Sequence, residues 1–338
     1  MQKILVTGGV GYIGSHTAVA LIQSGYEVVI VDDLSNTKIE LLGGIKTITG
    51  VSPKFYEGDL KDAGLVNKIF TENQIDAIIH FAASKAVGES VEQPLKYYKN
   101  NFLSMVNLLE HAVSGKIPFV FSSSCTVYGN PDKLPVTEQT PIKPATSPYG
   151  NTKQVGEEIL VDSVHAYQDL KVIALRYFNP IGAHESAELG ELPLGVPSNL
   201  VPYLLQVAAG ERVFLSVYGN DYNTPDGTCI RDYIHVVDIA EAHVVAVARL
   251  LENKNKNRYE VFNLGTGQGN SVLELINTFE KVNEIKLDYK IVDRRPGDVE
   301  KIYADTTYTN DELGWKTRLN LEDMLRSAWK WQKKLSNL

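Results

Sequence analysis

Two hydrophobic periods alternate along the first 180 residues of the chain. Short apolar runs predict buried strands over residues 3–7, 27–31, 54–58, 76–81, 117–121 and 171–177. Apolar residues at helical spacing predict helices over residues 14–24, 62–73, 94–114 and 149–165. This alternation of strand and helix predicts an α/β fold, a Rossmann-like doubly wound parallel sheet with helices on both faces.

From about residue 180 the apolar segments become short and mixed, and glycine and proline are frequent over residues 180–198. The predicted elements there are helices over residues 199–209, 236–252 and 321–334 and strands over residues 214–218, 231–235 and 260–264. We therefore expect a large domain over residues 1–179 and a smaller mixed α/β C-terminal substrate domain over residues 180–338. Parts of residues 231–260 cross back to the first domain, and a cleft separates the two.

Composition narrows the class of protein. The chain has 338 residues, of which 43% are hydrophobic and 22% charged, as in a globular protein with a substantial core. A net charge of −8 argues against nucleic-acid and anionic-membrane partners. The two cysteines, Cys125 and Cys229, lie far apart, and we see no signal peptide and no long apolar run. We therefore expect a cytoplasmic protein, and the spacing of the seven histidines predicts no metal site.

A glycine loop follows the first strand in the pattern Gly8-x-x-Gly11-x-x-Gly14. Glycines let the backbone approach a pyrophosphate, which the N-terminus of the next helix attracts. Asp32 ends the second strand, 18 residues after Gly14, where a carboxylate can bind a ribose diol, although an acid there could also be a plain turn residue. No arginine stands beside it to receive a 2′-phosphate, which favours NAD over NADP.

Further polar residues follow the carboxyl ends of other strands, where ligands of such sheets bind. Asp59 follows the third strand and can contact an adenine, Ala82–Lys85 follow the fourth, and Ser122–Ser124 follow the fifth. Asn100 and its neighbour Asn101 are equally consistent with exposed polar positions. A second glycine run, residues 265–269, lacks a following strand with an acidic tip and is interpreted as a turn.

Tyr149 and Lys153 are four residues apart, so they share one face of the predicted helix. Ser147 can cap this helix, and Pro148 suits its first position. The lysine cation and the helix N-terminus both favour phenolate, so we expect Tyr149 to act as a base near neutral pH. A second pair, Tyr167 and Lys171, lies where a helix gives way to a strand and is interpreted as chance.

The glycine loop, Ser122–Ser124 and the Tyr149/Lys153 pair resemble the extended short-chain dehydrogenase/reductase family. Four further segments resemble its UDP-glucose 4-epimerase branch more closely. They are residues 85–90, residues 121–129, residues 176–184 and residues 226–236, and the match runs from about residue 2 to residue 334.

This resemblance implies a chemistry. A tightly held NAD⁺ takes hydride from C4 of a UDP-hexose, the 4-keto sugar turns over, and hydride returns to its other face, which interconverts UDP-galactose and UDP-glucose in galactose metabolism. Tyr149 is then the base, Lys153 lowers its pKa and binds the nicotinamide ribose, and Ser124 bridges the sugar hydroxyl and the phenol. Arg231 and Arg295 suit the diphosphate, since arginine binds phosphate bidentately.

The resemblance also implies residue sets and an assembly. The NAD contacts are Gly8, Gly11, Tyr12, Ile13, Gly14, Asp32, Asn36, Asp59, Leu60, Phe81, Ala82, Lys85, Asn100, Ser122, Tyr149, Lys153, Tyr177 and Phe178. The UDP-hexose contacts are Ser124, Tyr149, Asn179, Asn199, Leu200, Tyr218, Arg231, Tyr233, Arg295, Asp298 and Ile302. The family's habit is a homodimer, with the fourth and fifth helices as the interface.

Some positions depart from the family pattern and leave alternatives open. Ala83-Ser84 stands where Gly-Leu is common, and Cys125 where alanine is common. Ile302 occupies the position that gates N-acetylated sugars, so UDP-N-acetylhexose or dual specificity stays open. A nucleotide-sugar dehydratase or decarboxylase would need an acid after Ser124. A non-catalytic NAD-sensing protein would lose Ser124, Tyr149 or Lys153, and a simple alcohol reductase would not need the arginines.

Overall fold

The computed structural model describes residues 1–295 and 297–337. The strands are β1 (Lys3–Thr7), β2 (Glu27–Asp32), β3 (Lys54–Glu57), β4 (Ala77–His80), β5 (Phe119–Ser124), β6 (Val172–Tyr177), β7 (Asn179–Ile181), β8 (Leu215–Tyr218), β9 (Ile230–His235), β10 (Tyr259–Leu264), β11 (Gly269–Ser271), β12 (Tyr289–Val292) and β13 (Lys301–Ile302). The α-helices are α1 (Tyr12–Gln23), α2 (Leu41–Thr49), α3 (Ala63–Glu72), α4 (Val87–Glu92), α5 (Pro94–Gly115), α6 (Pro148–Ala166), α7 (Leu200–Ala208), α8 (Val236–Leu251), α9 (Val272–Asn283) and α10 (Leu321–Leu335). Two short turns complete the set, the 3₁₀ turn η1 (Cys125–Tyr128) and the π-helical turn η2 (Thr309–Leu313).

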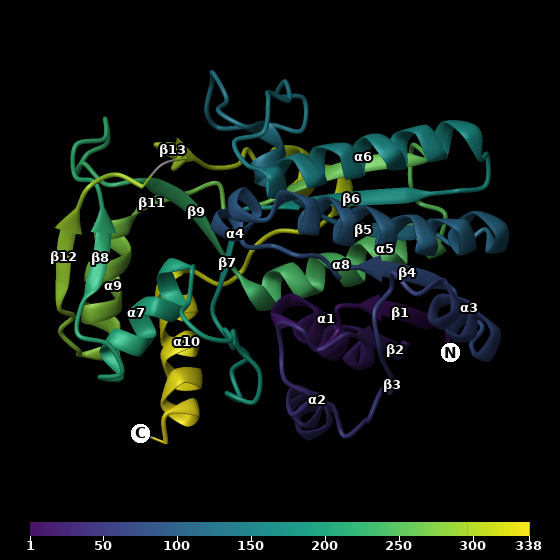
Figure 1. Ribbon diagram of the computed structural model, residues 1–338, viewed down its shortest axis with the longest axis horizontal. Coiled ribbons are helices and arrows are strands. Elements are labelled where there is room, and N and C mark those ends of the chain that lie inside the picture. The colour runs from purple at the N-terminus through teal and green to yellow at the C-terminus, as the bar shows by residue number, and fades with distance from the viewer. Residues whose placement is uncertain (296, 338) are drawn as a thin grey trace.

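The main sheet is parallel throughout, in the order β10-β6-β5-β4-β1-β2-β3 (Figure 1). The strand order reverses between β1 and β4. In doubly wound sheets this reversal opens a crevice at the carboxyl ends of the strands. The predicted doubly wound fold is confirmed, and the crevice is where the glycine loop, Asp32 and the serine run converge.

Helices bury both faces of this sheet, as Figure 1 shows. Successive side chains of a strand point to opposite faces. Ile4 and Val6 pack with α1, α2 and α8 on one face, and Leu5 packs with α3, α5 and α6 on the other. Because both faces are covered, the strands are almost continuously apolar, which is why they could be recognised in the sequence.

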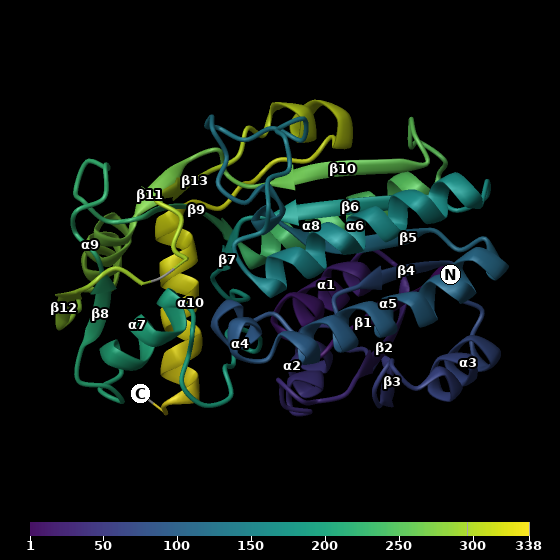
Figure 2. The same cartoon turned by 45° about the horizontal axis from the view of Figure 1, so that its top comes forward.

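A smaller C-terminal unit lies beside the main sheet (Figure 2). Its own core joins α7, α9, α10 and β8, and its short sheets are β12-β8 and β11-β9-β13 with β7 added to β9. After β9 the chain returns to the main sheet, where α8 packs on α1 and β10 forms the edge next to β6. The domain boundary at residue 179 stays a prediction.

Across residues 1–295 and 297–337, no helix combines the length and the apolar character needed to cross a bilayer.

Candidate active site

The glycine loop forms one end of the site. Gly8 has a positive φ of 64°, and a Cβ on it would lie 2.8 Å from the backbone nitrogen of Ala82. A Cβ on Gly14 would lie 2.2 Å from the carbonyl oxygen of Gly8. These positions therefore need glycine. Helix α1 follows with Gly11 at its N-cap and no capping side chain, so its first N–H groups are free to bind an anion.

The carboxyl ends of the strands surround a cavity of about 890 Å³. Every residue predicted to bind NAD lines it, except Phe178. Phe178 is instead buried in a cluster with Cys125 and Ile302. The cavity has the size of a site for a large small-molecule ligand.

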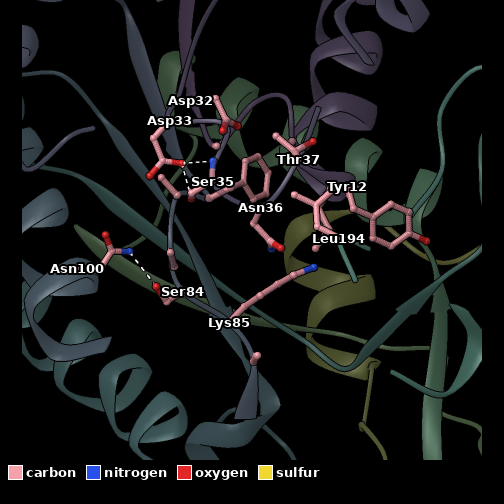
Figure 3. Close-up of a pocket in the computed structure, with 18 of the residues that line it drawn as sticks. Tyr12, Asp32, Asp33, Ser35, Asn36, Thr37, Ser84, Lys85, Asn100 and Leu194 are labelled. Atoms are coloured by element: carbon pink, nitrogen blue, oxygen red, sulfur yellow. Dashed lines mark hydrogen bonds between the residues drawn. The ribbon is translucent and has the colours of Figure 1, made fainter. Parts of the chain in front are cut away.

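Asp32 stands at the tip of β2, in the wall of the cavity (Figure 3). Its carboxylate accepts hydrogen bonds from the N–H groups of Val10 and Leu34, each at 3.0 Å. The next residue, Asp33, accepts from the backbone and side chain of Ser35. Two neighbouring carboxylates suit a ribose diol and repel a 2′-phosphate. The glycine loop, the free helix N-terminus and Asp32 together fit NAD.

Tyr149 and Lys153 lie at the other end of the same cavity. They occupy the first turns of α6, which begins at Pro148 and whose N-cap Ser147 accepts a hydrogen bond from Gly150 N–H at 3.1 Å. The Lys153 Nζ lies 5.9 Å from the centre of the Tyr149 ring. The cap, the proline and the shared helix face are as expected. The chance pair is also separated as expected, since Tyr167 is the C-cap of α6.

The expected lowering of the Tyr149 pKa is not found in the chain without NAD, and its role as the base stays a prediction. Burial raises the pKa of Tyr149 to about 12, and the interaction with Ser124 only partly opposes that rise. The reason is that desolvation of the phenolate outweighs the favourable groups around it. The Lys153 Nζ donates a hydrogen bond to the carbonyl oxygen of Ser122 at 2.6 Å.

Lys153 itself is buried, and desolvation lowers its pKa to about 8, against an opposing effect of Glu157. Its ammonium also lies 4.9 Å from the centre of the Phe121 ring. The side chain is therefore mostly protonated at pH 7, but its pKa is only about one unit above that pH.

Four of the predicted substrate residues form a chain of contacts. Arg295 Nη2 lies 2.8 Å from Asp298 Oδ1, and its guanidinium lies 5.3 Å from the centre of the Tyr218 ring. Arg231 Nη2 lies 3.9 Å from the same Asp298 oxygen. Two guanidinium groups that share one carboxylate form a ready site for a diphosphate. In the β9–β13 ladder, Ile302 pairs with Arg231.

The other predicted substrate residues lie on nearby elements. Asn179 opens β7 and pairs with Tyr233 of β9. Asn199 caps α7, lines the NAD cavity and donates to Glu191 at 3.0 Å, and Leu200 is the first residue of that helix. Ser124 ends β5 and accepts a bond from Thr126 N–H at 3.2 Å. They stay predictions for the substrate.

The second glycine run is a turn, as expected, and it encloses a carboxylate. Asp232 is fully buried and accepts from Thr266 N–H at 2.8 Å, from Thr266 Oγ1 at 2.6 Å and from Gly267 N–H at 3.1 Å. Ala304 N–H adds a fourth bond at 3.1 Å. A Cβ on Gly265 would lie 2.4 Å from Asp232 Oδ2, so this position needs glycine. Successive backbone N–H groups of this kind bind anions, and here the anion is internal.

Several cavity residues were missed in the sequence. Tyr97 comes from α5, and Glu191 and Leu194 come from the segment between β7 and α7. Lys85 Nζ lies 3.9 Å from Glu191 Oε1, so this segment meets the loop after β4 across the cavity. Figure 3 shows Leu194 beside Tyr12. No periodic signal marks residues 191–198, and only their place in the fold reveals them.

Cys125 is a buried residue, as expected, and burial raises the pKa of its thiol to about 12, so it is no nucleophile at neutral pH. Within the described part of the chain, no three histidine, cysteine or carboxylate side chains gather in a way that could hold a metal ion.

Comparison with known proteins gives the same picture. A family model described as GDP-mannose 4,6 dehydratase matches residues 5–328. The UDP-glucose 4-epimerase of Bacillus subtilis is 52% identical over 98% of this chain and 97% of its own. The structure of the present chain is similar to that of UDP-glucose 4-epimerase from Bifidobacterium longum in complex with NAD⁺ and UDP, with a TM-score of 0.95 and 47% identity over 99% of each chain. The enzyme from Stenotrophomonas maltophila with bound NAD and formylated UDP-arabinopyranose gives a TM-score of 0.96 and 48% identity over 100% of this chain and 99% of that one.

The family model is described as a dehydratase, whereas the relatives are epimerases, so the two activities must be distinguished. The position after Ser124, where a dehydratase would need an acid, holds Cys125. Relatives at about half identity over nearly the full length, together with this site, decide between the two. The chain belongs to the UDP-glucose 4-epimerase family, NAD-dependent enzymes of the extended short-chain dehydrogenase/reductase type.

Proposed function

We propose that the protein interconverts UDP-galactose and UDP-glucose by reversible oxidation at C4 of the hexose. The observation that carries this proposal is that Tyr149 and Lys153 line the same cavity as the glycine loop and Asp32. Arg231 and Arg295 do not line this cavity; they lie on the C-terminal unit, where both contact Asp298.

The chain's own residues hold the cofactor. The N–H groups at the start of α1 bind the pyrophosphate, and Asp32 accepts from the adenosine ribose. Lys153 and Tyr177 lie at the opposite end of the cavity, on the side of Tyr149, and hold the nicotinamide half. NAD, when bound there, supplies a reversible two-electron oxidation of the neighbouring carbon.

Tyr149 takes the proton of the C4 hydroxyl and later returns it. Ser124 orients the hydroxyl, and the positive charge of Lys153, 5.9 Å from the centre of the Tyr149 ring, favours the phenolate. Arg231 and Arg295 hold the diphosphate, in competition with Asp298, while the sugar turns. The protein therefore holds the substrate by its nucleotide, and the hexose can turn either face toward the nicotinamide.

The test is a coupled assay on purified protein with UDP-galactose and no added reductant. We expect UDP-glucose to form. Absence of turnover in protein that carries NAD would overturn the proposal. UDP-N-acetylgalactosamine is assayed in parallel, because the family resemblance implies that Ile302, which packs in a cluster with Phe178 and Cys125, gates N-acetylated sugars.

We also propose that the protein is a homodimer in the cytoplasm, without nucleic-acid partners. Exposed apolar side chains on α4 and at the start of α5 support the dimer; Val91 is 62% exposed and Leu95 81% exposed. Two free cysteines support a reducing compartment, and the net charge of −8 supports the absence of nucleic acid. Light scattering tests the dimer, and a mass of one chain would contradict it.

A further inference from the structure

A third ionisable residue continues the face of α6 that carries the tyrosine and the lysine. Glu157 follows Lys153 by four residues, just as Lys153 follows Tyr149, so the three side chains lie one turn apart on the same face. Glu157 is 4% exposed. Glu157 does not line the cavity.

The Glu157 carboxylate is fully engaged. Its Oε1 accepts from Ser123 Oγ at 2.5 Å and from Arg176 Nε at 2.9 Å, and its Oε2 accepts from Arg176 Nη2 at 2.5 Å. Arg176 belongs to β6 and Ser123 to β5, so one carboxylate joins the helix to two strands. A buried carboxylate held by a bidentate arginine and a hydroxyl is fixed in position.

Ser123 lies between two groups of the active site. The carbonyl of the preceding residue, Ser122, accepts the Lys153 ammonium at 2.6 Å. The following residue, Ser124, interacts with Tyr149. The bond from Ser123 to Glu157 therefore fixes the segment of β5 that positions both partners.

The charges around Lys153 make Glu157 important for a second reason. Arg176 is buried beside Glu157, and Lys153 lies one turn away, so two cations share the neighbourhood of this carboxylate. The other titratable groups that face these residues come from each packed element: Tyr149 on α6, His80 on β4, Tyr177 on β6, Tyr128 on η1, Tyr259 on β10, and Glu138, whose carboxyl interacts with Arg176. Burial keeps His80 and the tyrosines neutral at pH 7, because it raises the pKa of the tyrosines and lowers that of His80 to about 3.

We propose that Glu157 is a positioning residue of the reaction, which holds the serine run of β5 against α6 and keeps the Lys153 side chain charged beside Tyr149. This inference rests on the proposed function for its kinetic consequence. Its electrostatic part concerns only residues of the chain and stands without substrate.

The perturbation that isolates the charge is Glu157→Gln. Glutamine has nearly the same size and keeps one acceptor for Arg176 or Ser123. It removes the carboxylate that interacts with both Lys153 and Arg176, and Glu138 is then the acidic group whose charge still interacts with Arg176. The pKa of Lys153 should then fall by about two units, since removing a unit charge one helical turn (about 6 Å) away costs about that much at an effective dielectric constant of about 20. Since the pKa of Lys153 is already near 8, most of its charge at pH 7 would be lost.

Two variants serve as controls. Glu158→Gln makes the same chemical change at the next residue of α6, where the side chain is exposed. Glu260→Gln removes a buried carboxylate that Arg249 holds at 2.7 and 2.9 Å on β10, away from the cavity wall. The first controls for the charge change, and the second controls for the loss of a buried ion pair.

The first readout is the titration of Lys153, followed by NMR of isotopically labelled lysine Cε in each NAD-loaded protein and assigned by the loss of its signal in Lys153→Met. We expect a lower pKa in Glu157→Gln, an unchanged one in both controls, and partial recovery in Glu157→Asp. A Lys153 pKa in Glu157→Gln equal to that of the original protein would overturn the inference, whatever the activity.

The second readout is the pH profile of UDP-galactose turnover. In Glu157→Gln we expect kcat at pH 7 to fall about tenfold or more, with the basic limb of the profile shifted to lower pH and KM changed far less. Glu260→Gln, which can lose stability, should keep the shape of the profile. A uniform loss of activity at every pH in Glu157→Gln would mean a merely structural role and refute the proposal. Inactivity of the original protein would refute the proposed function and leave the lysine titration as the decisive result.

Discussion

Replacing Asp232 by asparagine should destabilise the contact between β9, which carries Arg231, and β13, which carries Ile302. Asp232 follows Arg231 on β9. Its carboxylate accepts hydrogen bonds from Thr266 and Gly267 of the glycine turn and from Ala304, two residues after the end of β13. Asparagine preserves the shape of the side chain and removes one of its two acceptor oxygens. The amide that replaces it would face backbone N–H groups that it cannot satisfy.

The magnitude follows from the bonds on each oxygen. If the remaining oxygen keeps the two bonds from Thr266, the N–H groups of Gly267 and Ala304 lose their acceptor. Each unpaired buried donor costs about 1–3 kcal/mol. Part of this is offset because burial raises the pKa of Asp232, which means that its charged form is costly in the fold. We expect a net loss of about 2–4 kcal/mol in the free energy of unfolding.

The assay is thermal unfolding of the NAD-loaded protein, with UDP affinity measured by calorimetry. For 338 residues the unfolding entropy is about 0.7 kcal/mol per kelvin, so Tm should fall by about 3–6 °C. Asp169→Asn is the control, because Asp169 forms an exposed ion pair with Lys116 and should change Tm little. UDP affinity should also fall, since Arg231 is adjacent. A Tm within a degree of the control would refute the reasoning.

Three further outcomes follow from the site. Tyr149→Phe should lower kcat by about 10²-fold or more while Tm stays unchanged, and near-normal turnover would remove Tyr149 from its role. Gly8→Ala should reduce the NAD content of purified protein, because the φ of 64° disfavours alanine and the added Cβ would lie 2.8 Å from the backbone nitrogen of Ala82. The control is Gly210→Ala, where φ is 74° but no atom beyond the neighbouring residues lies within 4 Å of the added Cβ, and it should keep its full NAD content. The free energy of unfolding should fall as the pH drops below 6.5. Burial lowers the pKa of His16 and His80 to about 3, so these two histidines bind protons in the unfolded chain but not in the folded protein. A Tm that stays constant from pH 6.5 to pH 5 would contradict this.

Much of the main sheet could be predicted because its strands are buried on both faces, as β1 and β6 show by their continuous apolar runs. Helix α2 was missed because Gly43 and Gly44 weaken its intrinsic propensity. It forms because Leu41 and Ile45 pack against the core on the α1 side. Its stability comes from tertiary contacts, which a local pattern does not contain.

The site residues also fall into those that a local sequence pattern predicts and those that only the fold brings together. The glycine loop and the Tyr149/Lys153 spacing are local, and the sequence therefore predicted where they lie. Leu194 and Glu191 reach the cavity from a segment beyond the main sheet, without any periodic signal. The pKa of Tyr149 was predicted in the wrong direction because it depends on how much protein surrounds the phenol, which spacing does not reveal.

The high pKa of Tyr149 suits a reaction that begins and ends at an alcohol. A base that only removes protons would work best with a pKa near the ambient pH, and Tyr149 at about 12 is far above it. An epimerase must return the proton it has taken, so a phenol that holds its proton firmly has an advantage while the sugar is a ketone. Deprotonation then requires added positive charge close to the ring, and the protein alone supplies the Lys153 ammonium at 5.9 Å, with a pKa of about 8. In the proposed reaction, proton removal at Tyr149 is therefore confined to the state in which NAD⁺ and the lysine charge are both present, and Glu157 is the residue we propose to protect that charge.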